Sequence, residues 1–145
     1  MLIAVIVVFL AFVVFVIRVG TRNPRRMPKT GKIIGYKKVY VIDKYDTVCD
    51  SVIATLEIPK DALRNQEILR RKYLEPKCRA SKAKVLSLKS CWGGAPVSKA
   101  YSYYDRDFSY EVGKIVTPKR SFDTSNETCA SGIHFYMLEK DARNH

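Results

Sequence analysis

The sequence contains no acidic residue before Asp43 and only two histidines in 145 residues. No charged side chain of either sign occurs in residues 1–17. Between Arg18 and Lys38 there are eight basic residues and no acid, whereas the rest of the chain carries 18 basic and 14 acidic residues. The chain thus has an apolar N-terminal segment (residues 1–17, the apolar head), a basic segment from Arg18 to Lys38 (the basic neck) and a nearly balanced remainder. This arrangement excludes a plain soluble enzyme and a disordered tail. A chain of 145 residues allows one modest core.

Short chemical motifs are also missing. The four cysteines are Cys49, Cys78, Cys91 and Cys129. They include no C-x-x-C pair, which argues against a zinc knuckle or ribbon. Four cysteines permit one or two disulfides, but reduced and partly buried thiols are the default if the domain faces the cytosol. Because Gly93-Gly94 is not followed by Lys-Ser or Lys-Thr, it is no phosphate loop, and the sequence predicts neither a metal site nor a cofactor.

The apolar head predicts a transmembrane helix. Residues 1–17 carry no polar side chain, so the segment has no amphipathic face with which to lie on a membrane surface. At 1.5 Å per residue such a helix reaches about 25 Å, close to the ~30 Å hydrocarbon core of a bilayer. No Lys or Arg precedes the run, which favours an uncleaved anchor over residues 1–19 against a signal peptide. The predicted anchor side chains are Leu2, Ile3, Val5, Ile6, Phe9, Phe12, Phe15 and Ile17.

The basic neck predicts the orientation of this anchor. Asn23-Pro24, Pro28 and Gly31 break regular structure, so residues 20–32 are predicted to form a linker. The basic residues lie on the C-terminal side of the apolar run, which favours a single-pass protein with its C-terminal domain on the cytosolic face. The residues expected to set this topology and to contact lipid headgroups are Arg18, Arg22, Arg25 and Arg26.

Residues 33–145 are predicted to form a compact α+β domain, made mostly of strands with one or two short helices. Strands are expected at 33–42, 51–58, 77–88, 108–112, 114–116 and 133–137. A turn around Asp43–Asp46 would join the first two strands into a hairpin. A helix is expected to start at Pro59 and to end before Pro76, and a short helix is expected in the tail 139–145.

Cys129 and His134 lie five residues apart and invite a thiol–imidazole hypothesis. An activated thiol needs the imidazole within hydrogen-bond reach and a third group that orients it. If residues 133–137 form a strand, His134 shares one face with Tyr136, and the apolar residues of the segment occupy the other face. This pattern favours a structural or half-exposed histidine, and the chain is expected not to be an enzyme.

Aromatic residues gather between positions 101 and 110. Alternating aromatic side chains most often pack in a core, and a partner-protein surface is the functional alternative. The neighbouring charges are of mixed sign, which argues against nucleic-acid binding here. The residues of the predicted partner surface are Tyr101, Tyr103, Tyr104 and Arg106. The basic stretch Lys60–Lys89 is expected to be a solvated face.

Three segments of the second half resemble an uncharacterised domain family: KCRASKAKVLSL, AYSYYDRDFSYEVGKIV and FDTSNETCASGIHFYMLEKDA. The resemblance covers residues 77–143, and its most specific part is Cys129 with Gly132-Ile133-His134-Phe135. The family occurs in large nucleocytoplasmic DNA viruses, and in some phage and bacterial proteins beside pentapeptide repeats. The resemblance implies a viral setting and brings no catalytic role to any residue.

Together these features predict a non-enzymatic structural protein of a virion, of the minor capsid type. Viruses of this kind build a shell around an internal bilayer, so the domain would lie between that membrane and the capsid. Its predicted function is to tether the two through protein–protein contacts, with no small-molecule substrate inferred. Two alternatives stay open: a thiol-active membrane protein or enzyme that uses Cys129 and His134, and a membrane tether for nucleic acid.

Overall fold

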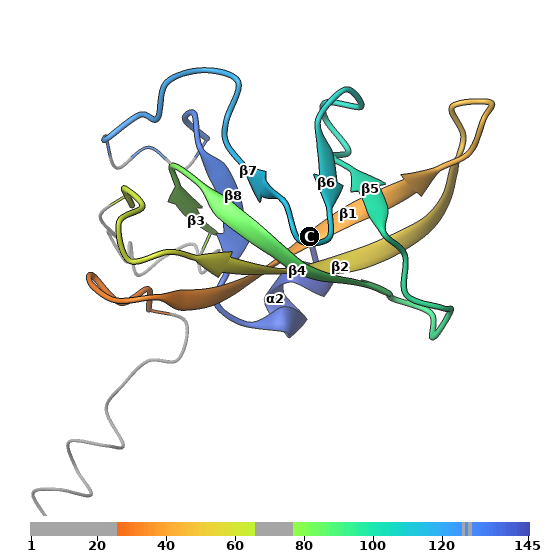
Figure 1. Ribbon diagram of the computed structural model, residues 1–145, viewed down its shortest axis with the longest axis horizontal. Coiled ribbons are helices and arrows are strands. Elements are labelled where there is room, and N and C mark those ends of the chain that lie inside the picture. The colour runs from red at the N-terminus through yellow and green to blue at the C-terminus, as the bar shows by residue number, and fades with distance from the viewer. Residues whose placement is uncertain (1–25, 66–76, 126, 128) are drawn as a thin grey trace, which may run out of the picture.

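The computed structural model describes residues 26–65, 77–125, 127 and 129–145, and antiparallel strands dominate this part of the chain (Figure 1). The strands are β1 (Ile33–Ile42), β2 (Val48–Ile58), β3 (Lys77–Ala80), β4 (Ala83–Ser90), β5 (Lys99–Tyr101), β6 (Ser109–Glu111), β7 (Ile115–Val116) and β8 (Ile133–Tyr136), and the helix after them is α2 (Glu139–Arg143). The strands form one curled sheet in the order β3-β8-β1-β2-β4-β7, and β5 pairs with both β1 and β6.

The long hairpin of β1 and β2 is the centre of the sheet. Val39 faces Val52 across the pair, and both side chains are fully buried. Asp43 stabilises the turn, because its Oδ1 accepts hydrogen bonds from the backbone N–H groups of Tyr45 and Thr47 at 2.8 and 2.9 Å. The first two predicted strands and the hairpin between them are confirmed.

The single strand predicted over residues 77–88 is wrong, because the chain forms two strands there. β3 pairs with β8 and β4 pairs with β2, so they lie on opposite sides of the central hairpin. Ser81 lies at the bend between them. Its N–H donates to the Leu63 carbonyl at 2.9 Å, and its Oγ accepts from the Leu63 N–H at 2.8 Å. These bonds to a preceding segment replace strand pairing and end β3.

Each face of the sheet has its own core. The main core fills the inner side of the curl, and its largest fully buried apolar side chains are Val39, Val52, Leu56, Ile58, Val85, Leu88 and Phe135. On the outer face α2 covers a smaller cluster, in which Ala142 packs with Ile53 and Tyr136. Figure 1 shows α2 on one side of the β1–β2 hairpin and β6 and β7 on the other.

The predicted α+β fold class is wrong in its balance of helix and sheet. The described residues form a mostly β structure, in which α2 has five residues. The first residues of the helix expected after Pro59 are not helical, because Arg64 forms an antiparallel bridge with Ala80, and residues 66–76 lie outside the described part. The short helix predicted in the tail is confirmed.

The prediction of a single-pass membrane protein also needs correction. In residues 26–65, 77–125, 127 and 129–145 the structure holds no helix long and apolar enough to cross a bilayer. The described helix, α2, has five residues, whereas a span needs about 20. The predicted transmembrane helix and the single-pass membrane location therefore find no support in the described residues. The predicted anchor of residues 1–19 lies outside the described residues, as do Arg22 and Arg25.

Part of the predicted linker lies against the sheet. Met27 is buried in the main core. The guanidinium of Arg64 donates hydrogen bonds to the carbonyl oxygens of Pro28, at 2.9 Å, and of Gly31. Arg26 is exposed. The described chain is thus fixed to the sheet from Met27 onward.

Candidate functional site

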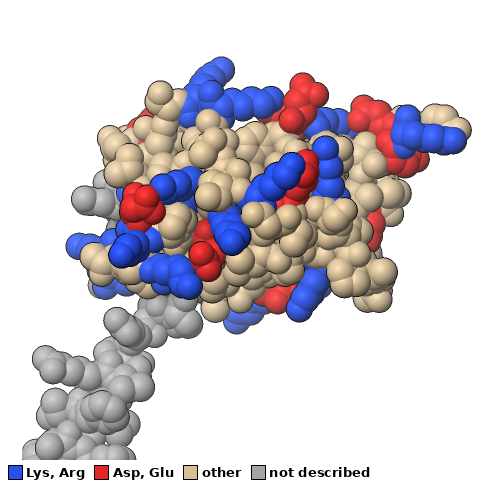
Figure 2. All heavy atoms as spheres, in the orientation of Figure 1, with Lys and Arg blue, Asp and Glu red and all other residues tan. Residues whose placement is uncertain are grey.

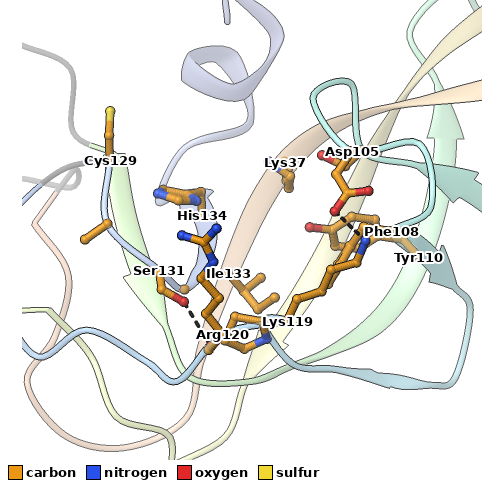
Figure 3. A pocket seen from close by; sticks show the side chains of 14 residues that line it. Lys37, Asp105, Phe108, Tyr110, Lys119, Arg120, Cys129, Ser131, Ile133 and His134 are labelled. Carbon is orange, nitrogen blue, oxygen red and sulfur yellow. Dashed lines mark hydrogen bonds and ion pairs between the residues drawn. The ribbon is translucent and has the colours of Figure 1, made fainter.

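A groove of about 430 Å³ lies over β1, between β6 and β8 (Figure 3). Its walls come from these strands and from the loop segments 102–108, 118–120 and 129–132. Cys129 and His134 are among the lining residues. The groove therefore joins parts of the chain that are far apart in the sequence, and its volume is in the range of small-molecule sites.

Lys37 projects from β1 into this groove (Figure 3). In the register of the central hairpin it faces Ala54, which belongs to the main core, so its side chain leaves the sheet on the inner side. Burial, and to a smaller extent the positive charge of Lys77, lower the pKa of Lys37 from 10.5 to about 8. In the described part of the chain no carboxylate contributes to this shift. Lys37 therefore carries its charge at neutral pH at an energetic cost.

We expect Lys37→Met to raise the free energy of unfolding at pH 7 by about 1–3 kcal/mol. The pKa of about 8 in the folded state lies below the ordinary value of 10.5, so the charged lysine penalises folding fully below pH 8. That penalty fades as the pH rises from about 8 to 10.5. Urea unfolding of both proteins at neutral and at alkaline pH measures the difference, and the gain should shrink at the higher pH. A gain that is independent of pH, or equal to that of exposed Lys89→Met, would contradict this account.

The groove wall on the β6 side combines an ion pair with aromatic rings. The Lys119 Nζ lies 2.7 Å from Asp105 Oδ2, and this hydrogen bond lowers the pKa of the Asp105 carboxyl. The rings of Phe108 and Tyr110 lie 5.3 Å apart. Burial raises the pKa of Tyr110, so its phenol stays neutral. This wall therefore has no net charge and presents aromatic surface.

The opposite wall is fixed by a fully buried arginine of β3, Arg79. Its Nη1 donates hydrogen bonds to the carbonyl oxygens of Asp123 and Ser131 at 2.9 and 2.7 Å. Its Nη2 donates to the carbonyl oxygen of Ser125 at 2.8 Å. The guanidinium carbon also lies 5.3 Å from the centre of the Phe122 ring. One side chain thus ties the loop that precedes β8 to the sheet.

Packing explains three residues of the motif formed by Cys129 and Gly132-Ile133-His134-Phe135. A Cβ atom at Gly132 would lie 3.1 Å from the Arg79 Cβ and 3.1 Å from the Phe122 ring, so only glycine fits without movement of its neighbours. The Ile and Phe of the motif are buried in the main core. The remaining two, Cys129 and His134, line the groove.

The orientation of Cys129 does not favour a thiol–imidazole pair. Figure 3 shows the Cys129 thiol pointing away from the His134 ring. A thiol nucleophile needs its base within hydrogen-bond reach. β8 buries Ile133 and Phe135 and leaves His134 half-buried, which is the alternation expected from the sequence.

Three exposed or half-exposed tyrosines form a second feature, which we call the tyrosine cluster: Tyr40, Tyr103 and Tyr104. Tyr103 is 58% exposed and Tyr104 is 94% exposed. The Tyr103 ring lies 5.1 Å from that of Tyr40 and 5.3 Å from that of Tyr104, with an edge-on contact in the second pair. Tyr101 faces Tyr40 in the pairing of β5 with β1. The structure therefore brings the predicted tyrosines beside a residue of β1 that the sequence did not single out.

Arg106, the fourth residue of the predicted partner surface, has a structural contact. Its Nη1 lies 2.7 Å from Asp46 Oδ2, which links the loop 102–108 to the β1–β2 turn.

Figure 2 shows Lys and Arg side chains interspersed with Asp and Glu on the face drawn. In the basic stretch, Lys82 pairs with Asp61 at 2.6 Å. The described charges on this face are thus mixed rather than of a single sign.

The cysteines occupy different environments. Cys78 is buried, Cys91 is half-buried, and Cys49 and Cys129 are exposed. The Cys49 thiol donates a hydrogen bond to the Val41 carbonyl at 3.5 Å. Among the described residues no group of three or more His, Cys, Asp or Glu side chains is placed to hold a metal ion.

Sequence reasoning missed Lys37, which lines the groove, and Arg79, which holds the loop in one of its walls. A signal for Lys37 was present, because it occupies an inward position of an alternating strand between Gly35 and Val39. Arg79 carried a weaker signal. It lies between Cys78 and Ala80, but a buried arginine is recognisable only once the carbonyl groups around it are known.

Comparison with known proteins gives both a family and a viral relative. The family model described as "Family of unknown function (DUF5758)" matches residues 23–142. An uncharacterized protein of Acanthamoeba polyphaga mimivirus is 31% identical over 128 residues, which cover 76% of this chain and 81% of the relative. No solved structure matches the chain. The resemblance to an uncharacterised domain found in viruses is thereby confirmed, and the chain belongs to this family of unknown function, DUF5758.

Proposed function

We propose that this protein is a non-enzymatic binding module that attaches to a structural protein of a large DNA virus through the tyrosine cluster. The observation that carries the proposal is the exposure of Tyr103 and Tyr104, 58% and 94%, in ring contact with one another. Exposed tyrosines are enriched at the energetic centres of protein interfaces. The mimivirus relative supports the viral setting.

The cluster is suited to binding because its rings are already in contact before a partner arrives. Tyr103 packs between Tyr40 and Tyr104. Aromatic side chains that are held by neighbours lose little conformational entropy on binding. Burial of such rings supplies a large apolar area, while their hydroxyl groups can bond to the polar edge of an interface.

The charges around the cluster favour a protein over single-stranded nucleic acid. Stacked tyrosines bind nucleic-acid bases when a basic groove follows the phosphates. Here Arg106 pairs with Asp46 at 2.7 Å, and Lys99 pairs with Glu111 at 3.5 Å. Arg106 of the loop that carries Tyr103 and Tyr104, and Lys99, which lies 5.5 Å from the Tyr101 ring, are therefore compensated, as is common at the polar rim of a protein interface.

Crosslinking mass spectrometry on purified virus particles that contain the full chain tests this proposal. We expect links from Lys99 and Lys44 to a structural protein of the particle. Replacing Tyr103 and Tyr104 together by Ala should reduce these links by about tenfold or more, because truncation of central aromatic residues typically costs 2 kcal/mol or more.

The matched control is Ile115→Ala, which truncates a 62% exposed apolar residue on β7. It should leave the crosslinks unchanged, and both variants should unfold at the temperature of the parent. Persistence of the links in the tyrosine variant would contradict the proposal. Binding of an oligonucleotide with a steep dependence on salt, lost in the tyrosine variant, would replace it by nucleic-acid recognition.

A further inference from the structure

We propose that the groove over β1 binds a small organic phosphate, whose dianion contacts Lys37 and Arg120 and whose aromatic or apolar part lies against Phe108. The inference rests on the lining of the groove and does not depend on the role of the tyrosine cluster. Figure 3 shows both cationic side chains in the groove, Lys37 from β1 and Arg120 from the loop before β8.

Lys37 lies on the inner side of the sheet. A charged ammonium on the inner side of a sheet is unfavourable unless an anion compensates it. The described neighbours supply no such anion, since the charge that acts on Lys37 is the positive charge of Lys77. A bound phosphate would provide the missing compensation, and binding sites often retain groups that lower stability.

The residues that line the groove carry more positive than negative charge. Asp105 is the acid among the lining residues, and its carboxylate already pairs with Lys119 at 2.7 Å. Lys37 and Arg120 therefore leave an excess of two positive charges. A phosphate monoester carries close to two negative charges at pH 7, whereas a carboxylate carries one. The excess matches the phosphate.

The groove has one wall that hydrogen bonds hold in place and one that is aromatic. Arg79 fixes Ser131 through its carbonyl, and the Ser131 Oγ donates to the Arg120 carbonyl at 2.9 Å, so the backbone that presents Arg120 is held in place. Phe108 and Tyr110 add an aromatic wall on the other side. A volume of about 430 Å³ accommodates a ring together with a phosphate group.

Phenyl phosphate combines a phosphate group with an aromatic ring, so it is the probe in a titration of the full chain. Calorimetry and amide chemical shifts detect its binding. We expect saturable binding, with shifts at Phe108, Ser131 and Gly132. Lys37→Met should weaken binding about tenfold or more, the loss expected for one charge-assisted hydrogen bond. Arg120→Met should weaken the binding of phenyl phosphate as well. This second variant tests the proposal even if Lys37→Met does not fold.

Lys38→Met is the matched control, because Lys38 is the next residue of β1, faces the other side of the sheet and donates to the Arg143 carbonyl at 2.9 Å. It should bind the probe like the parent, as should the Tyr103/Tyr104 variant. Benzoate should bind more weakly than phenyl phosphate. Absence of saturable binding at millimolar phenyl phosphate, equal binding by Lys37→Met, or equal affinity for benzoate would overturn the proposal.

Discussion

Arg79→Met should lower the free energy of unfolding by about 3–5 kcal/mol, because three hydrogen bonds from a buried guanidinium are lost. The methionine fills much of the volume, but it leaves the carbonyl oxygens of Asp123, Ser125 and Ser131 without their donor. A hydrogen bond from a charged donor contributes about 1.5–3 kcal/mol. The measurement is urea unfolding, with amide hydrogen exchange to show where protection is lost.

The loss should be concentrated in the loop before β8, since that loop holds all three acceptors. Arg79→Lys should fail to restore stability, because a single ammonium cannot reproduce donation from both Nη1 and Nη2. Arg120→Met, an exposed arginine in the same loop, should change stability by less than about 0.5 kcal/mol. If Arg79→Met and Arg120→Met have equal effects, the buried guanidinium does not hold the loop.

Gly35→Ala should lower the free energy of unfolding by about 2–3 kcal/mol, the upper part of the range for overpacking. A Cβ atom at this position of β1 would lie 2.3 Å from the Phe135 ring, so either the ring or the backbone of β1 must move. An alanine in a strand would otherwise be favoured over glycine. Thermal and urea unfolding of the single variant measure the net effect.

A double-mutant cycle separates this clash from other effects of the methyl group. In the Phe135→Leu background the aromatic ring is absent, so the cost of Gly35→Ala should fall below about 1 kcal/mol. Gly94→Ala is the control, because its nearest neighbour would be the Ser90 Oγ at 3.3 Å, at the end of a small side chain. Additive effects of the two core substitutions would show that Gly35 and Phe135 are not coupled.

The parts of the fold that sequence reasoning found are those that local pattern specifies. β1 and β2 show long runs of β-branched and aromatic residues, and Asp43 supplies the turn with its own hydrogen bonds. The segment 77–88 shows equally good strand composition, yet it forms two strands. Its interruption at Ser81 depends on bonds to Leu63, which the sequence pattern does not contain.

The membrane prediction differs from the described structure for another reason. It rested on an apolar run that lies outside the described residues, and the described residues hold no helix able to span a bilayer. The predicted partner surface rested on composition alone. It located Tyr103 and Tyr104, but the contact of Tyr103 with Tyr40 depends on the pairing of β5 with β1.

The sequence by itself determined the central hairpin, the strand around the Gly132–Phe135 motif and the family, because these depend on short-range alternation and on residue identity. The tertiary structure decided what the charged residues do. Lys37 becomes a groove residue because its position on β1 faces the inside of the curl, and Arg79 becomes a structural centre because three backbone carbonyls converge on it. The role of a charged side chain depends on the groups around it, and in this fold those groups come from distant parts of the chain.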